Sequence, residues 1–120
     1  MTKRQTQDVI TKKVISLYKE LLGTGPKNVK TYIVEDMVIV RVNGRLLPIE
    51  QILLEGKGGV DIVKDIRKAL HEATTAKFSE VVESISNKKV ISSHSDVSTK
   101  TGEIVNILIL SENLEKELPV

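Results

Sequence analysis

Two pairs of short β-rich runs, each joined by a turn, dominate the pattern of this 120-residue chain. The four runs span residues 29–34, 37–42, 89–97 and 103–110. Glu35-Asp36 separates the first pair, and the turn-forming tetrapeptide Thr99-Lys100-Thr101-Gly102 separates the second. Connections this short join antiparallel strands, because parallel neighbours need a crossover of about a dozen residues or more. The chain is therefore limited to antiparallel hairpins.

Helical patterns precede each hairpin. Residues 6–22 carry apolar side chains at offsets of three and four, and Pro26 follows soon after as a helix stop. Pro48 suits the first turn of a short helix at 49–54, and a long amphipathic helix is predicted from residue 60 to residue 86. The apolar stripe of that helix comprises Ile62, Val63, Ile66, Ala69, Leu70, Ala73, Phe78, Val81, Val82 and Ile85.

The order αββ(α)αββ predicts an α+β fold, with an antiparallel sheet of about four strands and the helices packed on one face. The run 37–42 is almost wholly apolar, which predicts an inner strand buried on both faces. The other face of the sheet would lack helices. Since single chains rarely leave a large apolar face in water, we expect a homodimer.

Length and composition exclude several classes of protein. The chain fits a single domain, residues 1–120, in which residues 1–6 and 112–120 are expected to be disordered or frayed. The absence of cysteine excludes disulfide scaffolds, thiolate zinc sites and cysteine nucleophiles. No apolar run approaches the roughly 20 residues needed to span a bilayer, so we expect a cytoplasmic protein with no membrane span.

Charge and aromatic content argue only weakly for nucleic-acid binding. The net charge is +2, and the three aromatic residues Tyr18, Tyr32 and Phe78 are too few for a base-stacking surface. Residues 1–30 nevertheless hold seven basic and two acidic residues, a net charge of +5. A basic first helix could contact nucleic acid, although such a charge run is more often a solvated face.

The third strand carries an unusual polar segment, Ser92-Ser93-His94-Ser95-Asp96. A catalytic triad needs three side chains that converge, whereas on a strand His94 and Asp96 share one face and Ser93 and Ser95 the other. We therefore expect no catalytic residues here. An edge strand, a projecting hairpin arm or a strand at an interface would each explain the polarity. An interface and a solvated edge both stay open, and His94 is the side chain expected to titrate near neutrality.

Metal and phosphate sites are not favoured either. His94 and Asp96 would need further ligands, and nothing in the spacing brings His71 to them. We expect no metal site and no cofactor. Gly56-Lys57-Gly58-Gly59 and Gly23-Thr24-Gly25-Pro26-Lys27 resemble phosphate cradles, but neither matches a P-loop or a dinucleotide-binding fingerprint. An ordinary turn between helices is the favoured interpretation of the first stretch.

Several segments together resemble the bacterial MpsC family. They are Gly25-Pro26-Lys27 leading into 29–34, then 35–41, Leu47-Pro48-Ile49-Glu50, and the polar-rich stretch 89–103. The resemblance covers residues 7 to 114, and the last stretch is its most specific part. Two departures are Ser86-Asn87, where Thr-Gly is common, and Asn106 in an otherwise apolar final strand.

The resemblance implies the complex to which the protein belongs rather than a reaction that it catalyses. The family takes its name from a Na⁺-translocating membrane-potential-generating system related to inorganic-carbon uptake complexes. It implies a small companion of a large cytosolic subunit and a polytopic membrane subunit, and it brings no catalytic residue or cofactor.

The sequence therefore favours a non-enzymatic accessory or regulatory protein that acts through protein–protein contact. The predicted interaction surface comprises Ser93, His94, Ser95, Asp96, Ser98, Thr99, Lys100, Thr101 and Glu103, with Glu35 and Asp36. The alternative is a nucleic-acid-binding or regulatory module that uses the basic first helix. A weaker third hypothesis is a small enzyme or a bicarbonate-binding protein that uses His94 and Lys100.

Overall fold

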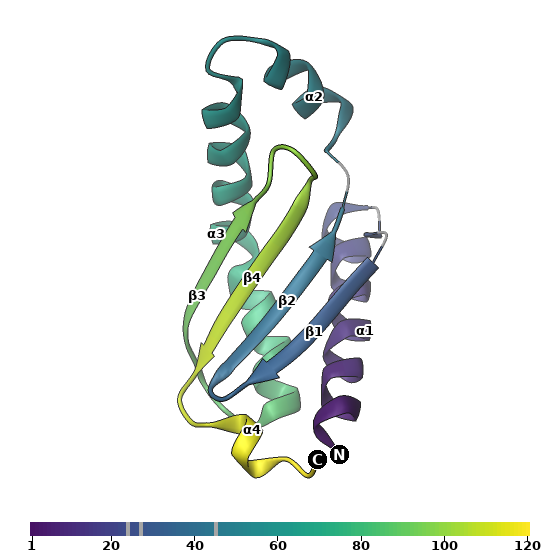
Figure 1. The fold of residues 1–120 in the computed structure, drawn as a ribbon, viewed down its shortest axis with the longest axis vertical. Coiled ribbons are helices and arrows are strands. Elements are labelled where there is room, and N and C mark those ends of the chain that lie inside the picture. The colour runs from purple at the N-terminus through teal and green to yellow at the C-terminus, as the bar shows by residue number, and fades with distance from the viewer. Residues whose placement is uncertain (24, 27, 45) are drawn as a thin grey trace.

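The computed structural model describes residues 1–23, 25–26, 28–44 and 46–120, and it has the predicted α+β architecture (Figure 1). The elements are α1 (Lys3–Leu22), β1 (Asn28–Val34), β2 (Met37–Asn43), α2 (Pro48–Glu55), α3 (Gly59–Ser86), β3 (Val90–Val97), β4 (Glu103–Leu110) and α4 (Leu114–Glu117). Within the described residues, no helix is both long enough and apolar enough to cross a membrane.

The four strands form one antiparallel sheet in the order β1-β2-β4-β3. Both predicted hairpins are present, and the second lies beside the first through the pairing of β2 with β4. The register aligns Tyr32 with Ile39, Ile39 with Ile107, and Ile107 with His94. The polar strand β3 is therefore at one edge of the sheet, and β1 is at the other.

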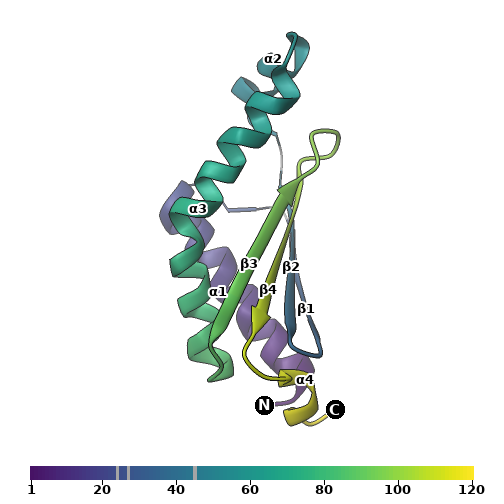
Figure 2. The same ribbon diagram turned by 90° about the vertical axis from the view of Figure 1, so that its left-hand side faces the viewer.

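Helices cover one face of this sheet only, as Figures 1 and 2 show from two directions. The buried cluster between the layers comprises Ile10, Val14, Val29, Ile33, Val38, Val40, Val42, Val82, Leu108, Leu110 and Leu114. It is built from aliphatic side chains, which suits the small number of aromatic residues. The Tyr18 and Phe78 rings lie beside it, with their centroids 5.3 Å apart.

The prediction that β2 is buried on both faces is wrong. Val38, Val40 and Val42 face the helices and are buried, whereas Met37 and Ile39 lie on the opposite face and are only partly buried. A strand can be wholly apolar because both of its faces are buried, or because one face is buried and the other is apolar but uncovered. Strand β2 is of the second kind.

The apolar stripe predicted for α3 is also buried over only part of its length. Val63 and Val82 are buried, but Ile62, Ile66 and Leu70 remain between 41% and 44% exposed. The first half of α3 extends past the sheet together with α2, as Figure 2 shows. We call α2 and residues 59–70 of α3 the helical arm. Val63 is buried there, but most of its other apolar side chains are exposed.

The two ends of the chain lie side by side at the base of the sheet (Figure 1). The sequence predicts frayed segments at 1–6 and 112–120, but the structure ties these segments together. Thr2 and Gln5 form a capping box, so α1 begins at Lys3. The Lys3 backbone N–H donates to the Pro119 carbonyl at 2.9 Å, and the Lys3 ammonium lies 2.7 Å from Glu115 Oε2.

The glycine-rich stretch at 56–59 forms the turn between α2 and α3. Gly58 adopts a positive φ of 78°, and a Cβ at Gly59 would overlap the Leu53 carbonyl group. Gly58 is thus explained by its positive φ, and Gly59 by the close approach of the two helices. The other glycine-containing stretch, at 23–27, includes Thr24 and Lys27, which lie outside the described residues.

Candidate functional site

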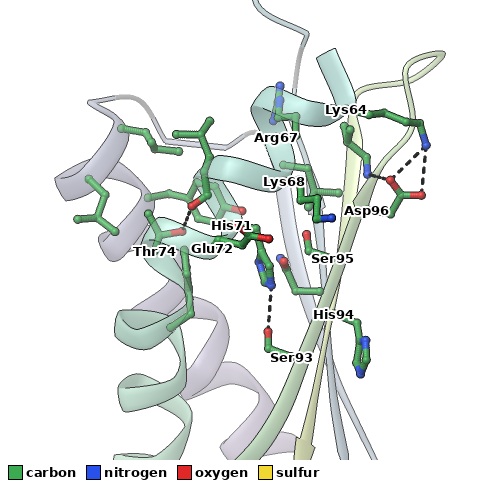
Figure 3. Close-up of a pocket in the computed structure, with 18 of the residues that line it drawn as sticks. Lys64, Arg67, Lys68, His71, Glu72, Thr74, Ser93, His94, Ser95 and Asp96 are labelled. Atoms are coloured by element: carbon green, nitrogen blue, oxygen red, sulfur yellow. Dashed lines mark hydrogen bonds and ion pairs between the residues drawn. The ribbon is translucent and has the colours of Figure 1, made fainter. Parts of the chain in front are cut away.

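A pocket of about 460 Å³ lies between the end of α1, the middle of α3, and strands β3 and β4 (Figure 3). Its lining comprises Tyr18, Leu21 and Leu22 from α1; Lys64, Asp65, Arg67, Lys68, Leu70, His71, Glu72, Thr74 and Phe78 from α3; Ser93, His94, Ser95, Asp96 and Val97 from β3; and Ile104 and Asn106 from β4. The pocket therefore includes much of the polar strand that the sequence singles out.

Polar side chains on the helix-facing side of the sheet form the floor of this pocket. Ser95 pairs with Asn106, and Ser93 pairs with Leu108, so both serines face α3. Side chains alternate along a strand, which places His94 and Asp96 on the uncovered side. Serine is too small to reach α3 as a leucine or valine would. A space therefore remains where the rest of this face is filled by aliphatic side chains.

His71 of α3 is the histidine that meets the polar strand. Its Nε2 lies 3.2 Å from Ser93 Oγ, and Figure 3 shows the ring directed at this hydroxyl. Burial lowers the pKa of His71, and the nearby His94 also lowers it, while the charge of Glu72 acts in the opposite direction. The neutral imidazole is therefore favoured, and it can donate to Ser93 or accept from it.

The Ser93–His71 contact resembles two members of a triad. Such a pair becomes a strong nucleophile when a carboxylate holds the other ring nitrogen. In the described part of the chain no hydrogen bond joins His71 to a carboxylate. Nor do the described residues include a group of three or more histidine and acidic side chains that could hold a metal ion.

Tyr18 of α1 also lines the pocket. Burial raises the pKa of its phenol, while a hydrogen bond with the Asn106 side chain and the positive charge of Arg67 act in the opposite direction. The phenol therefore stays protonated at neutral pH. It adds a further hydroxyl to the polar floor.

Three cations from two turns of α3, Lys64, Arg67 and Lys68, also line the pocket. Lys64 pairs with Asp96 at 3.2 Å, and Arg67 holds Glu50 of α2 through two contacts of 2.6 and 2.7 Å. Lys64 and the Val97 N–H keep the pKa of Asp96 below its usual range, with the backbone contact as the larger cause. Lys68 makes no ion pair with any residue that the structure describes.

The predicted interaction surface divides into separate regions. Ser93 and Ser95 face the pocket, His94 lies exposed on the uncovered face, and Asp96 is held by Lys64. The turn after β3 is organised by Ser98, whose carbonyl accepts from Gly102 N at 2.7 Å. Thr99, Lys100 and Thr101 thus lie at the tip of the hairpin, and Glu103 pairs with Arg41 at 2.8 Å.

The Glu35-Asp36 turn is not part of the same surface. It lies at the opposite end of the sheet from the β3–β4 turn, next to α4 (Figure 1). The Glu35 N–H donates to Glu115 Oε1 at 3.0 Å, and the Glu35 carbonyl accepts from the Glu115 N–H at 3.1 Å. Contacts within the chain thus occupy the backbone of this turn.

Sequence reasoning missed the contribution of α3 to the site. His71, Lys68 and Arg67 fall within the amphipathic pattern of a long helix, where polar residues are expected on the solvent side. Their spacing of three and four residues shows that they share one face. It does not show that this face lies opposite the polar strand, because that depends on where α3 crosses the sheet.

Comparison with known proteins places the chain in a family. It is 35% identical over 117 residues to uncharacterized protein YbcI of Bacillus subtilis, an alignment that covers 98% of this chain and 94% of that protein. It is 26% identical over 111 residues to uncharacterized protein YrhF of the same organism, which covers 92% and 88%. No solved structure matches. The model of the family described as "Na⁺-translocating membrane potential-generating system (MpsC)" matches residues 2–112, and the chain belongs to this MpsC family.

Proposed function

We propose that this chain is a non-enzymatic accessory protein that acts through protein–protein contact within a membrane-potential-generating system. The family description supports the setting. The observation that carries the proposal is the amount of apolar surface that the single chain leaves uncovered.

The molecule exposes more surface than its mass requires. Its accessible surface is 7570 Å², compared with roughly 6,500 Å² expected for a compact protein of 13.3 kDa. Its radius of gyration of 15.0 Å exceeds the roughly 13.6 Å expected for 120 residues. The excess of roughly 1,000 Å² is comparable with the roughly 800 Å² that each partner buries in a standard interface.

Two regions hold most of the exposed apolar side chains. The first is the helical arm, where Ile49 and Ile52 of α2 are 66% and 67% exposed. The second is the uncovered sheet face, where the register aligns Tyr32, Ile39 and Ile107 in one row across three strands. Apolar patches of this kind are typical of surfaces that bind another protein.

We assign the sheet face to a homodimer. A two-fold axis that lies in the interface, parallel to the sheet, would pair this face with itself, so the apolar row of one copy would contact that of the other. The contact would be centred on Ile39 and Ile107, so the helical arm, the hairpin tip and the edge strand β3 would remain free in the dimer. We assign these regions to contact with the large cytosolic and membrane subunits that the family resemblance implies.

The Ser93–His71 pair supports a non-enzymatic role rather than a hydrolytic one. In a Ser-His-Asp triad a carboxylate orients the histidine ring, and within the described residues no carboxylate is hydrogen-bonded to His71. We assign the polar strand to recognition for the same reason. His94 is exposed on it, and Lys100 projects from the turn that follows.

Pull-down with the companion subunits tests the proposed surface. The triple variant His94→Ala, Asp96→Ala and Lys100→Ala should reduce capture by about tenfold or more, because interface contacts of this kind contribute more than about 1.4 kcal/mol together. A control variant with Lys77→Ala and Glu80→Ala, both exposed on α3, should keep wild-type capture. Unchanged capture by the triple variant would contradict the assignment of this surface.

The basic helix supports a second candidate function, nucleic-acid binding. Arg4, Lys12, Lys13 and Lys19 are exposed on α1, and none forms an ion pair with a residue that the structure describes. Lys3, by contrast, is held by Glu115. Binding of this kind would weaken steeply with added salt, because it depends on the release of counterions. Absence of DNA and RNA binding at ~50 mM salt would eliminate it.

A further inference from the structure

The two edges of the sheet differ in what covers them. At the β1 edge, the Ile33 N–H donates to Gln7 Oε1 of α1 at 2.8 Å. Thr11 of the same helix donates to Thr31 Oγ1, also at 2.8 Å, so α1 lies against this edge. Strand β3 forms the other edge, and in the described part of the chain no further strand lies beside it (Figure 1). An uncovered edge strand can pair with another extended chain, because its outward N–H and C=O groups have no strand to bond to.

The pairing with β4 shows which residues of β3 point outward. The Ser98 N–H donates to the Glu103 carbonyl at 2.9 Å, so Ser98 faces β4. In an antiparallel pair, residues that exchange hydrogen bonds with the neighbouring strand alternate with residues that do not. The register is regular from Ser93 to Val97. The N–H and C=O groups of Ser93, Ser95 and Val97 therefore point away from β4.

Carboxylates occupy the outward N–H groups at both ends of β3. Asp96 Oδ1 accepts the Val97 N–H at 2.8 Å. At the start of the strand, Glu83 Oε2 of α3 accepts the Val90 N–H at 2.9 Å. A β-bulge between Val90 and Ser92 also interrupts the regular pairing there. Charged side chains and bulges are features that limit pairing along an edge. Both ends of β3 are thus protected.

The centre of β3 lacks this protection. Among the described residues, no side chain accepts a hydrogen bond from the N–H of Ser93 or of Ser95. Ser95 is exposed, and Ser93 is partly buried. Each residue offers one donor and one acceptor, so a neighbouring strand could form up to four backbone hydrogen bonds with the two. The protected ends restrict such pairing to the centre of the strand.

The pocket of about 460 Å³ borders the same stretch of β3, since its lining includes Ser93, His94, Ser95, Asp96 and Val97. A strand added beside β3 would place alternate side chains on the two faces of the sheet. One set would lie on the side of the pocket, and the other would lie beside His94 on the uncovered face. Three basic and three acidic residues line the pocket, so their formal charges cancel. We therefore expect no preference for a charged side chain.

We propose that β3 is a docking edge, to which an extended segment of a partner protein adds as a further strand through backbone hydrogen bonds to Ser93 and Ser95. The centre of the segment would carry uncharged β-branched residues, which favour strands. This inference rests on the proposed function, because it names how the polar strand recognises a protein. It is compatible with the dimer, in which β3 remains free. It also gives the serines a role, since their small side chains leave the pocket open beside the edge.

A synthetic strand tests the docking edge independently of the natural partner. The probe is the peptide acetyl-Lys-Thr-Val-Thr-Val-Thr-Lys-amide, and its control is the same peptide with every central amide N-methylated. NMR of the full chain measures binding, and hydrogen exchange measures the protection of single amides. We expect saturable binding of the first peptide and about tenfold weaker binding of the control, which cannot donate backbone hydrogen bonds. Exchange should become slower at Ser93 and Ser95 but not at Val97, whose N–H already has a partner.

A matched pair of variants tests the backbone donor itself. Ser95→Pro removes one outward N–H, and an edge strand tolerates proline where the N–H points to solvent. We expect it to bind the peptide about fivefold more weakly than the wild type, because one hydrogen bond is lost. Ser95→Ala keeps the N–H and should bind like the wild type. The exchange rates of the wild type keep the test valid should Ser95→Pro misfold.

Three results would overturn the docking edge: no binding of the peptide, equally tight binding of the N-methylated control, or binding that leaves Ser93 and Ser95 unprotected. Hydrogen exchange in the complex with the companion subunits separates this inference from the proposed function. Protection of Ser93 and Ser95 in that complex would support both. Capture of the subunits without such protection would overturn the docking edge alone, and peptide binding without capture of the subunits would overturn the proposed partners alone.

Discussion

At the scale of single residues, a few polar side chains determine where this domain is hollow. Ser93 and Ser95 alternate with His94 and Asp96 along β3. The two serines therefore lie on the helix-facing side of the sheet, and His94 and Asp96 lie on the uncovered side. The helix-facing serines leave space under α3, and His71 reaches into that space. Valine side chains at the positions of Ser93 and Ser95 would fill the space between the sheet and α3.

The partly buried position of His71 predicts a dependence of stability on pH. Burial is the main cause that lowers the pKa of His71 in the folded chain, compared with about 6.5 in the unfolded chain. Near and below about pH 6.5, the His71 imidazole therefore takes up a proton more readily in the unfolded chain than in the folded chain. The contribution of His71 to the free energy of unfolding is therefore fully present above about pH 7. It is lost as the pH falls towards the lower pKa that His71 has in the folded state.

Chemical denaturation at a series of pH values measures this effect. The free energy of unfolding should fall more steeply on acidification for the wild type than for His71→Gln. Glutamine can still hydrogen-bond to Ser93 but does not take up a proton. Parallel curves for the two proteins would show that His71 is not the group responsible.

At the scale of elements, α2 is held to the rest of the molecule by a buried ion pair. Glu50 is 3% exposed, accepts the Leu47 N–H at 2.8 Å and receives two contacts from Arg67 of α3. The hydrogen bonds from Arg67 are the main reason why the pKa of Glu50 is low. Leu53 and Leu54 of α2 are partly buried, whereas Ile49 and Ile52 are largely exposed. The Glu50–Arg67 pair is therefore a main contact between α2 and α3.

Removing this pair should release α2 while the sheet stays folded. We expect Glu50→Ala to weaken the docking of α2 by about 3 kcal/mol, because it leaves the partly buried Arg67 guanidinium without a partner. Hydrogen exchange should become faster across residues 48–55 but not in β2 or β4. Glu55→Ala, at an exposed position of the same helix, should keep the wild-type rates. Faster exchange throughout the chain, or none, would contradict this picture.

At the scale of the whole molecule, one layer of helices covers one face of the sheet, and the other face is left apolar and open (Figure 2). Ile39 and Ile107 lie side by side in its centre, with His94 next to Ile107 on the edge strand. The helical arm adds a second exposed apolar region. Both regions explain why the accessible surface of 7570 Å² is large for the chain.

A charge in the centre of the open face should separate the proposed dimer. We expect wild-type protein to have twice the mass of one chain in sedimentation equilibrium and Ile107→Lys to have the mass of one. The thermal midpoint of isolated chains should change little, because Ile107 is only partly buried within one chain. Ile52→Lys, on the helical arm, serves as the control and should keep the dimer mass. A wild type that remains monomeric would refute the assignment of this face.

The hydrophobic pattern, together with the turn and proline signals, was sufficient to predict every element except α4. The predicted runs 29–34, 37–42 and 103–110 differ from β1, β2 and β4 by at most one residue. The predicted start of the first helix was less accurate, although Thr2 and Gln5 carry the spacing of a capping box. These features depend on neighbours within a few residues, and the sequence displays such neighbours directly.

The sequence by itself therefore determined the order of helices and strands, the two hairpins and the polar character of β3. Only the tertiary structure decided that β3 lies at an edge, that β2 has one open face and that α3 runs past the sheet. The contacts of the site also depend on tertiary structure: 22 residues separate His71 from Ser93, and 17 separate Arg67 from Glu50. Local spacing governs hydrogen bonds within a helix or a turn. The angle and position at which one layer crosses another depend on how all the side chains between them pack, and no single stretch of sequence contains that information.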